Sequence, residues 1–241
     1  VDFFRRVVEL QKPYREKKAI RNTLQTNAIS LDDAWCAFFK ENDFFIGVSL
    51  DGPKDIHDRY RKDRHGEGTF DRVMVGVHLL QKHQVEFNAL ACVGRDTAYR
   101  PLDVYRFFKD AGIHYIQFTP IVEREPDAQT QAIKLWLARP AMLDRPEPNT
   151  KVTPWTVEPE AYGDFLIAIY EEWVREDVGS VFVMNFEWAL TVWVGEPSPV
   201  CIFSKQCGRA VAMEHDGSVF ACDHYVYPEY KLGNVLTDNL G

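Results

Sequence analysis

Segments with the hydrophobic spacing of helices alternate with short runs rich in β-branched and aromatic residues, from residue 1 to about residue 194. This alternation is typical of repeated βα units, in which helices cover a sheet of parallel strands. The chain is 46% hydrophobic, which is ample for a sizeable core. We therefore predict an α/β fold with a parallel sheet over this part of the chain.

The individual elements follow from hydrophobic period, capping residues and turn residues. Strands are predicted over residues 19–28, 44–50, 86–93, 113–122 and 181–186. Helices are predicted over residues 1–14, after a cap at Ser30, from a cap at Thr69 to His83, from Pro101 to Gly112, and over residues 159–176 and 187–194. Residues 52–68 are polar and are assigned no element.

Two later segments depart from this alternation. Residues 123–157 contain five prolines and are predicted to be an insertion or lid loop, with one short helical piece near residues 129–138. Beyond residue 195, two short strand-like runs flank His215-Asp216-Gly217, and an Asp-Gly turn in that setting predicts a β-hairpin. A second module is therefore expected to begin there.

Composition excludes several classes of partner. The net charge is −8, with 36 acidic and 28 basic residues and no basic run, so a nucleic-acid partner is not expected. No apolar stretch is long enough for a membrane helix, so no membrane partner is expected. Five cysteines are too few for a disulfide scaffold and odd in number, which favours a reducing cytoplasm.

Three of the cysteines lie near the C-terminal end, at Cys201, Cys207 and Cys222. The predicted hairpin would bring Cys207 and Cys222 close together, so these thiols are candidate metal or cluster ligands. Their spacing alone leaves ordinary buried thiols equally open. Cys36 and Cys92 fall in a predicted helix and a predicted strand, where cysteine behaves as a small hydrophobic residue.

The hairpin carries a recognisable pattern. Gly217-Ser-Val-Phe-Ala-Cys222 follows Cys207 with nine residues between Cys207 and Gly217. This resembles the opening of the SPASM module, which has a Cys, a spacer and then Gly-x4-Cys.

Further motifs stand in the order found in anaerobic sulfatase-maturating enzymes, a family of radical S-adenosylmethionine (SAM) proteins that the whole chain resembles. They are LQTN at 24–27, GVSLDGP at 47–53, Ile56-His57, RKD at 61–63, VEFN at 85–88, Gln117-Phe118, CDHYV at 222–226 and LGN at 232–234. The segment 123–157 is longer than in this family.

The family's cluster motif C-x3-C-x2-C and its Gly-Gly-Glu-Pro motif are absent from the chain and are expected before Val1, and the remaining SPASM cysteines are expected after Gly241. The chain is therefore expected to be an internal fragment that is inactive by itself.

The resemblance implies a fold and an activity for the intact parent. Residues 1–195 would be a partial radical SAM (β/α) barrel without its first strands, and residues 196–241 the start of the SPASM module. The parent would cleave SAM reductively on a 4Fe-4S cluster and oxidise a Cys or Ser of an unfolded sulfatase peptide to Cα-formylglycine. An electron donor such as flavodoxin or ferredoxin would be a further partner.

Four residues are implied as SAM contacts. Ser49 and Arg61 would bind the SAM carboxylate, Gln25 the ribose or amino acid moiety, and Val122 the adenine. Ligands of parallel βα folds sit at the carboxyl ends of strands, where Gln25, Ser49 and Val122 are expected. The alternatives are a solvated charge for Arg61 and structural roles for Gln25 and Val122.

Two carboxylates in loops, Asp51 and Asp223, are expected to have different roles. Asp51 is expected to hold its tight loop through an Asx-type hydrogen bond rather than touch a ligand. Asp223 matches the family's catalytic base, which takes the proton from the substrate side chain if desolvation raises its pKa. The alternative for Asp223 is a loop residue that follows a strand.

The resemblance makes Cys201, Cys207 and Cys222 part of the ligand set of an auxiliary 4Fe-4S cluster, with a fourth ligand from beyond Gly241. Three rival functions remain. One is a SPASM enzyme with another peptide substrate, and the second is a non-catalytic peptide-binding or regulatory scaffold. The third is a zinc protein in which His224 joins the three cysteines.

Overall fold

The computed structural model describes residues 1–126, 128, 151–206 and 210–239. The chain divides into two compact units, Val1–Glu123 with Val152–Phe186 and Arg124–Lys151 with Glu187–Gly241. The predicted domain boundary between residues 195 and 196 stays a prediction. The short helix predicted near residues 129–138 lies outside the described residues.

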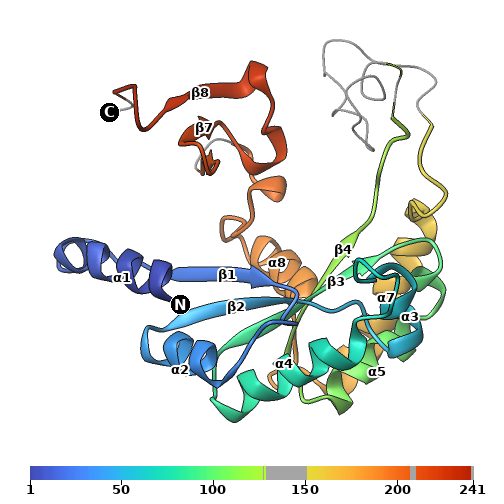
Figure 1. Cartoon of the computed structure of the whole chain (residues 1–241). Coiled ribbons are helices and arrows are strands. Elements are labelled where there is room, and N and C mark those ends of the chain that lie inside the picture. Colours follow the sequence, from blue (N-terminus) through green and yellow to red (C-terminus); the bar gives the residue numbers. More distant parts are fainter. Residues whose placement is uncertain (127, 129–150, 207–209, 240–241) are drawn as a thin grey trace. The chain divides into compact units, whose positions relative to one another are not determined.

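The first unit contains a sheet of five parallel strands (Figure 1). The strands are β1 (Asn22–Thr26), β2 (Phe44–Ser49), β3 (Phe87–Val93), β4 (Tyr115–Pro120) and β5 (Phe182–Val183). Their order in the sheet is their order in the chain, so each connection moves one strand further in the same direction. The predicted α/β fold with a parallel sheet is confirmed.

Helices α2, α4 and α5 lie along one face of this sheet (Figure 1). The helices are α1 (Asp2–Arg15), α2 (Asp33–Glu41), α3 (Lys54–Tyr60), α4 (Phe70–Lys82), α5 (Pro101–Asp110), α7 (Pro159–Glu176) and α8 (Met184–Trp193), with a 3-10 turn η1 (Thr97–Tyr99). Among the described residues, no helix is long and apolar enough to cross a membrane.

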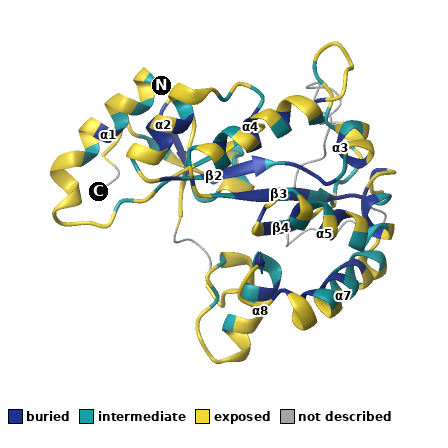
Figure 2. Cartoon of the chain, turned by 90° about the horizontal axis from the view of Figure 1, so that it is seen from below, coloured by how far each residue is buried: buried dark blue, intermediate teal, exposed yellow. Residues whose placement is uncertain are grey.

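The two faces of the sheet differ in character because successive side chains of a strand point to opposite faces. The strands are largely buried, as their dark blue stretches in Figure 2 show. The helix-covered face supplies the core with Ile46, Val48, Ala89, Ala91, Ile116 and Phe118. The opposite face carries half-buried or exposed side chains: Thr23, Gln25, Ser49, Leu90, Cys92, Gln117 and Thr119. We call this second surface the open face.

Two helix caps differ from those predicted. Asp32, not Ser30, caps α2, because its carboxylate accepts a hydrogen bond from the Trp35 N–H at 2.8 Å. Thr69 precedes α4 as expected, but its side chain makes no capping bond. The Asp58 carboxylate accepts from the Phe70 N–H at 2.8 Å instead, which frees the Thr69 hydroxyl for other partners.

The last strand of the sheet is shorter than predicted, and α8 begins earlier. The predicted strand 181–186 contains only β5, and α8 begins at Met184 rather than residue 187. The Asn185 side chain accepts from the Phe118 N–H and donates to the Phe118 carbonyl, both at 2.9 Å. Because this amide satisfies both backbone groups of Phe118, β4 needs no further strand residue there.

A short helix, α3, lies in the polar segment 52–68, where no element was predicted. One side of α3 is buried, with Ile56 7% exposed and His57 fully buried. A single turn or two of helix carries too little hydrophobic period to be recognised from sequence.

The second unit contains a small antiparallel sheet that confirms the predicted hairpin. Its strands are β6 (Ala212–Met213), β7 (Ser218–Phe220) and β8 (Lys231–Asn234), and 3-10 turns occur at η2 (Cys201–Phe203), η3 (Asp223–Tyr225) and η4 (Pro228–Tyr230). Gly217 adopts a φ of +82° in the turn, and the Asp216 carboxylate accepts from the Ser218 N–H at 2.9 Å. The Asp-Gly pair therefore makes the turn for the expected reason.

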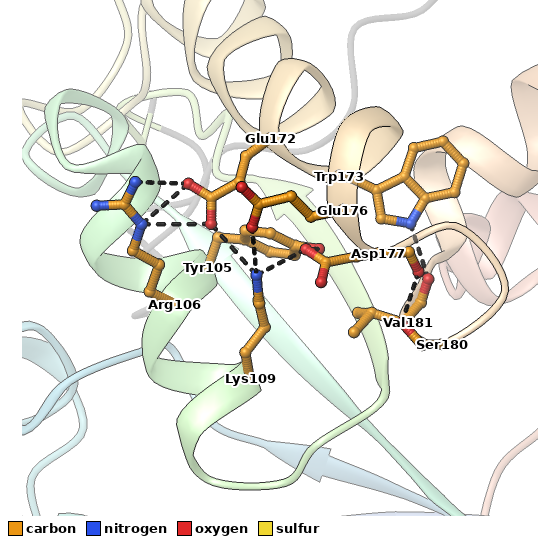
Figure 3. Close-up of polar contacts among 9 residues, drawn as sticks. All are labelled: Tyr105, Arg106, Lys109, Glu172, Trp173, Glu176, Asp177, Ser180 and Val181. Atoms are coloured by element: carbon orange, nitrogen blue, oxygen red, sulfur yellow. Dashed lines mark hydrogen bonds and ion pairs between the residues drawn. The ribbon is translucent and has the colours of Figure 1, made fainter.

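An ion cluster fastens α5 to α7 in the first unit (Figure 3). Lys109 Nζ lies 2.7 Å from Asp177 Oδ2, 3.4 Å from Glu172 Oε1 and 3.8 Å from Glu176 Oε2. Arg106 Nη2 lies 2.6 Å from Glu172 Oε2. The three carboxylates are close enough to hold a cation, and the Lys109 ammonium is that cation.

Replacing Glu172 with Gln is expected to lower the free energy of unfolding at pH 7 by about 1–2 kcal/mol, the scale of charge-assisted hydrogen bonds. The Glu172 side chain is only 12% exposed, and the hydrogen bond from Arg106 holds its pKa below the ordinary value despite burial. A lowered carboxylate pKa stabilises the fold above the unfolded pKa, and the gain disappears as pH falls through the folded pKa.

Urea unfolding of both proteins at pH 7 and at about pH 3, below the ordinary Glu pKa, measures this difference. Glu171→Gln is the matched control, since Glu171 is 61% exposed and only 4.0 Å from its partner Arg175. A loss of equal size at both pH values would contradict the role of the Glu172 charge.

Candidate functional site

The open face of the sheet carries polar side chains in neighbouring strands at matched heights. Gln25 of β1 pairs in register with Gly47 of β2, and Gly47 pairs with Asn88 of β3. A Cβ at Gly47 would lie 2.8 Å from Leu90 Cδ1 and 3.5 Å from Asn88 Oδ1. The Leu90 side chain therefore fills the space that a side chain at position 47 would take, between the exposed Gln25 and the 8% exposed Asn88.

The carboxyl end of β2 brings the predicted residue Ser49 to the same face. Ser49 is the last residue of β2, is half-buried and pairs in register with Leu90. The next row of the sheet continues from Leu90 to Gln117 of β4. The Ser49 hydroxyl therefore lies at a strand end, where ligands of parallel βα folds bind, and the Gln117 carboxamide lies in the same row within β4.

Arg61 follows α3 directly, and its guanidinium is turned back to the end of β2. Its Nε donates to Asp51 Oδ2 at 2.6 Å and its Nη2 to Asp51 Oδ1 at 2.9 Å. Nη2 also lies 3.6 Å from Cys92 Sγ, on the open face of β3. The alternative that Arg61 is a solvated loop charge is wrong, because its side chain is 27% exposed and paired.

Asp51 has a structural role, as predicted, but its carboxylate makes longer-range contacts in place of the predicted Asx-type hydrogen bond. Asp51 Oδ1 accepts a second hydrogen bond, from the Cys92 N–H at 2.9 Å. The Asp51 carboxylate therefore joins two strand ends and the end of α3 while its side chain is 7% exposed. A buried carboxylate with three N–H donors is well satisfied.

Behind this pair lies a buried imidazole. His57 Nδ1 accepts from the Asp51 N–H at 3.3 Å, and His57 Nε2 lies 3.0 Å from Thr69 Oγ1. Thr69 Oγ1 donates to the Arg61 carbonyl at 2.9 Å, so the neutral imidazole with its proton on Nε2 satisfies every partner. Burial lowers the pKa of His57, which agrees with this neutral form.

Charges at this site follow from burial and pairing. Burial is the largest single influence on Arg61 and opposes its charge, but the hydrogen bonds and charge of Asp51, together with Cys92, outweigh burial, so the Arg61 pKa lies above the ordinary value. Burial and then the Asp51 charge raise the pKa of Cys92, so this thiol stays protonated. Cys36 is fully buried as predicted, whereas Cys92 is half-buried and contacts Arg61.

Val122 lies just beyond β4 and is 66% exposed, so it is not a core residue. The backbone on either side of it is fixed. Ile121 N–H donates to the Val93 carbonyl at 3.0 Å, and the Glu123 carbonyl accepts from Thr153 N–H at 2.9 Å. An exposed apolar side chain on a fixed backbone is a suitable platform for a flat apolar ring.

The second unit holds the candidate ligands and base. Cys222, Asp223 and His224 place one ligand atom each within 4.8 Å of one another. Cys201 lies in η2 and is exposed, and it belongs to no such group of the described residues. Cys207 lies outside the described residues. Sulfur donors suit an iron–sulfur cluster or zinc, so the residues present fit a soft metal centre without selecting between the two.

Asp223 is well exposed, at 82% of its side chain, so the desolvation expected of it is not present within the described structure. Its Oδ1 accepts from the Cys222 thiol at 3.2 Å, and this hydrogen bond is the main cause of a pKa below the ordinary value. A cysteine that serves as a ligand is a thiolate with no proton to donate, so this lowering belongs to the thiol form.

Several contributors were not predicted from sequence. His57 and Thr69 form the layer behind Arg61, and no spacing signal connects residues from a short helix and a helix cap. Asn88 and Gln117 lie on the open face of buried strands. Polar residues within otherwise apolar strands were the available signal for these two.

Comparison with known proteins gives one family. No family model matches the chain. The serine-type anaerobic sulfatase-maturating enzyme of Bacteroides thetaiotaomicron is 45% identical over 240 residues, which cover 100% of this chain and 56% of that protein. The cysteine-type enzyme of Clostridium novyi is 30% identical over 238 residues, covering 98% of this chain and 58% of that protein.

Solved structures that resemble this chain come from the same family. The structure of hexahistidine-tagged anSMEcpe with bound AdoMet, which is SAM, has a TM-score of 0.81 at 31% identity and covers 100% of this chain and 58% of that one. Native anSMEcpe with bound AdoMet and Kp18Cys peptide has a TM-score of 0.75 at 30% identity, covering 99% of this chain and 61% of that one.

The chain thus spans little more than half the length of these relatives, with 56% of the first and 58% of the second covered. Within that span, the alignment extends over the whole chain, and the fold agrees with that of the solved structures. The chain belongs to the family of anaerobic sulfatase-maturating enzymes, which are radical SAM proteins with a SPASM module.

Proposed function

We propose that the protein containing this chain oxidises a Ser or Cys side chain of a sulfatase peptide to Cα-formylglycine in a SAM-dependent reaction. The observation that carries this proposal is similarity over the whole chain to both serine-type and cysteine-type sulfatase maturases. The AdoMet and peptide in the related solved structures support the same two ligands here.

Residues of the open face are proposed to bind SAM. Arg61 pairs with the SAM carboxylate, and the Ser49 hydroxyl donates to the same group. Gln25 contacts the ribose or amino acid moiety, and Val122 packs on the adenine. The position of Gln25 and Ser49 on the polar face of the sheet, at the strand ends, supports this assignment.

The second unit is proposed to supply cluster ligands and a base. Cys201, Cys207 and Cys222 hold an auxiliary 4Fe-4S cluster together with a ligand from outside this chain. Asp223 accepts the proton of the substrate hydroxyl or thiol. Its place directly after Cys222 and its exposed carboxylate support this role, since a base must reach the substrate.

SAM, when bound and given one electron by the reductant, would be cleaved to methionine and a 5′-deoxyadenosyl radical able to take a hydrogen atom from the substrate Cβ. For a Ser substrate, Asp223 would receive the hydroxyl proton, and iron–sulfur centres held by the protein would be able to accept the electron that the side chain still has to lose after the hydrogen atom. The role of the chain's own residues is to orient SAM against the substrate and to receive the proton. This chain by itself is proposed to be inactive, and an electron donor such as flavodoxin or ferredoxin is a proposed partner.

The test is anaerobic reconstitution of the protein at its natural length, with SAM, a reductant and sulfatase-derived Ser and Cys peptides. Iron and sulfide content, 5′-deoxyadenosine and peptide mass are measured together. The proposal predicts iron, SAM cleavage and an oxidised peptide. Iron and SAM cleavage with an untouched peptide would favour another SPASM substrate, zinc in place of iron would favour the zinc protein, and no metal would favour a non-catalytic scaffold.

A further inference from the structure

The contacts of Arg61 divide its guanidinium into two edges. The edge formed by Nε and Nη2 faces Asp51 and makes two hydrogen bonds, at 2.6 Å and 2.9 Å. The other edge is formed by Nη1 and the second hydrogen of Nη2. Within the described part of the chain, Nη1 has no hydrogen-bond partner, and besides Asp51 the only partner of Nη2 is the Cys92 sulfur at 3.6 Å, a weak acceptor.

The buried surroundings hold this orientation in place. Asp51 cannot swing away, because its Oδ1 also accepts from the Cys92 N–H at 2.9 Å. The backbone at both ends of the loop is also fixed. The His57 ring accepts a hydrogen bond from the Asp51 N–H and bonds to the Thr69 hydroxyl, and that hydroxyl donates to the Arg61 carbonyl. Asp51, His57 and Thr69 are each at most 5% exposed, so water does not compete for these bonds.

We propose that Asp51 is a positioning residue for SAM binding: it fixes the Arg61 guanidinium so that its free edge, Nη1 and Nη2, faces a carboxylate on the open face. This inference rests on the proposed function, in which Arg61 binds the SAM carboxylate. A planar fork held at one edge can bind a second carboxylate at the other with both bonds preformed.

Holding the Arg61 side chain in one conformation before SAM binds is expected to increase the affinity for SAM. An unpaired Arg side chain must lose several rotamers when it binds an anion, and that entropy reduces affinity. Asp51 imposes the bound conformation before SAM arrives. A second consequence is electrostatic: Asp51 neutralises Arg61 in the free protein, so the site does not hold an unpaired buried charge while it is empty.

Affinity for SAM in the full-length, cluster-loaded protein tests this inference. Arg61→Ala is expected to weaken SAM binding by about tenfold to a hundredfold, and Asp51→Asn by about tenfold, as for loss of charge-assisted bonds. The double variant should bind no more weakly than Arg61→Ala alone, because Asp51 acts only through Arg61. KM for SAM should rise in Asp51→Asn, while the maturation rate at saturating SAM stays unchanged.

Asp63→Asn is the matched control. Asp63 lies in the same segment, accepts two backbone N–H bonds where Asp51 accepts one, and pairs with Arg72 at 2.7 Å, but within the described structure it makes no hydrogen bond or ion pair with Arg61. Its loss should affect thermal stability as Asp51→Asn does and leave SAM affinity unchanged. If Asp51→Asn does not fold, Arg61→Lys replaces it, since lysine keeps the charge but cannot use two edges, and a tenfold loss is again expected.

Wild-type SAM affinity in Asp51→Asn, or losses that add in the double variant, would overturn the positioning role. Wild-type affinity in Arg61→Lys would overturn it as well. A wild-type protein that binds no SAM at all would overturn the proposed function itself, which separates the two failures.

Discussion

Replacing Asp223 with Asn is expected to lower the rate of formylglycine formation by about a hundredfold or more, the usual contribution of a general base. SAM binding and SAM cleavage should persist, because the residues proposed to hold SAM lie in other elements. Asn keeps the size and most of the shape of Asp, so the change removes the proton acceptor with little change in packing.

The physical case for a large effect is the exposure of this carboxylate. Asp223 has 82% of its side chain exposed, and among the described residues its carboxylate makes hydrogen bonds or ion pairs only with its neighbours Cys222 and His224. Asp223 therefore contributes little to the stability of the fold, and a large loss of rate in Asp223→Asn would come from the chemical step rather than from unfolding.

Single-turnover conversion of the peptide, followed by mass spectrometry beside 5′-deoxyadenosine, measures this effect. Glu214→Gln is the matched control, since Glu214 is another carboxylate of the same module, with 49% of its side chain exposed. Unchanged peptide conversion in Asp223→Asn would remove Asp223 from the mechanism and favour the alternative of an ordinary loop residue.

A methyl group at Gly76 is expected to cost about 2 kcal/mol of stability, within the range for overpacking a core site. Gly76 is buried in α4, and a Cβ there would lie 2.4 Å from the Ala28 carbonyl oxygen and 2.9 Å from Ala28 Cβ. Ala28 cannot retreat easily. It has a positive φ of 59°, and its N–H donates to Thr26 Oγ1 at 3.0 Å.

Gly163 provides the control with the opposite sign. It also lies inside a helix, α7, but a Cβ there meets nothing within 4 Å. Gly163→Ala should therefore stabilise by about 0.5–1 kcal/mol through helix propensity alone. Urea unfolding of both variants measures the contrast, and a gain in stability for Gly76→Ala would show that α4 does not pack closely on Ala28.

The sequence was sufficient for the fold class because the two hydrophobic periods are unambiguous in long elements. The helix Pro159–Glu176 was predicted with its observed bounds, and the Asp-Gly hairpin was located correctly. Shorter elements were predicted less well. Helix α3 was missed because it is too short for its hydrophobic period to be recognised, and β5 is shorter than predicted because the Asn185 side chain replaces a strand residue.

Sequence motifs indicated which residues belong to the candidate site, but not which side chains contact one another. Ser49 and Gln25 lie on the open face, which strand alternation alone could have indicated. The pairing of Arg61 with Asp51 joins residues ten positions apart, on either side of helix α3, which was not predicted. The Asx-type expectation for Asp51 considered local partners only, whereas its additional partner is the backbone of Cys92.

The central claim is SAM-dependent oxidation at the Cβ of a peptide Ser or Cys. Its most direct test is a sulfatase-derived peptide deuterated at that Cβ, incubated with the reconstituted full-length protein, SAM and reductant. The account predicts deuterium in 5′-deoxyadenosine and an aldehyde at the labelled residue. Unlabelled 5′-deoxyadenosine with an intact peptide would contradict it.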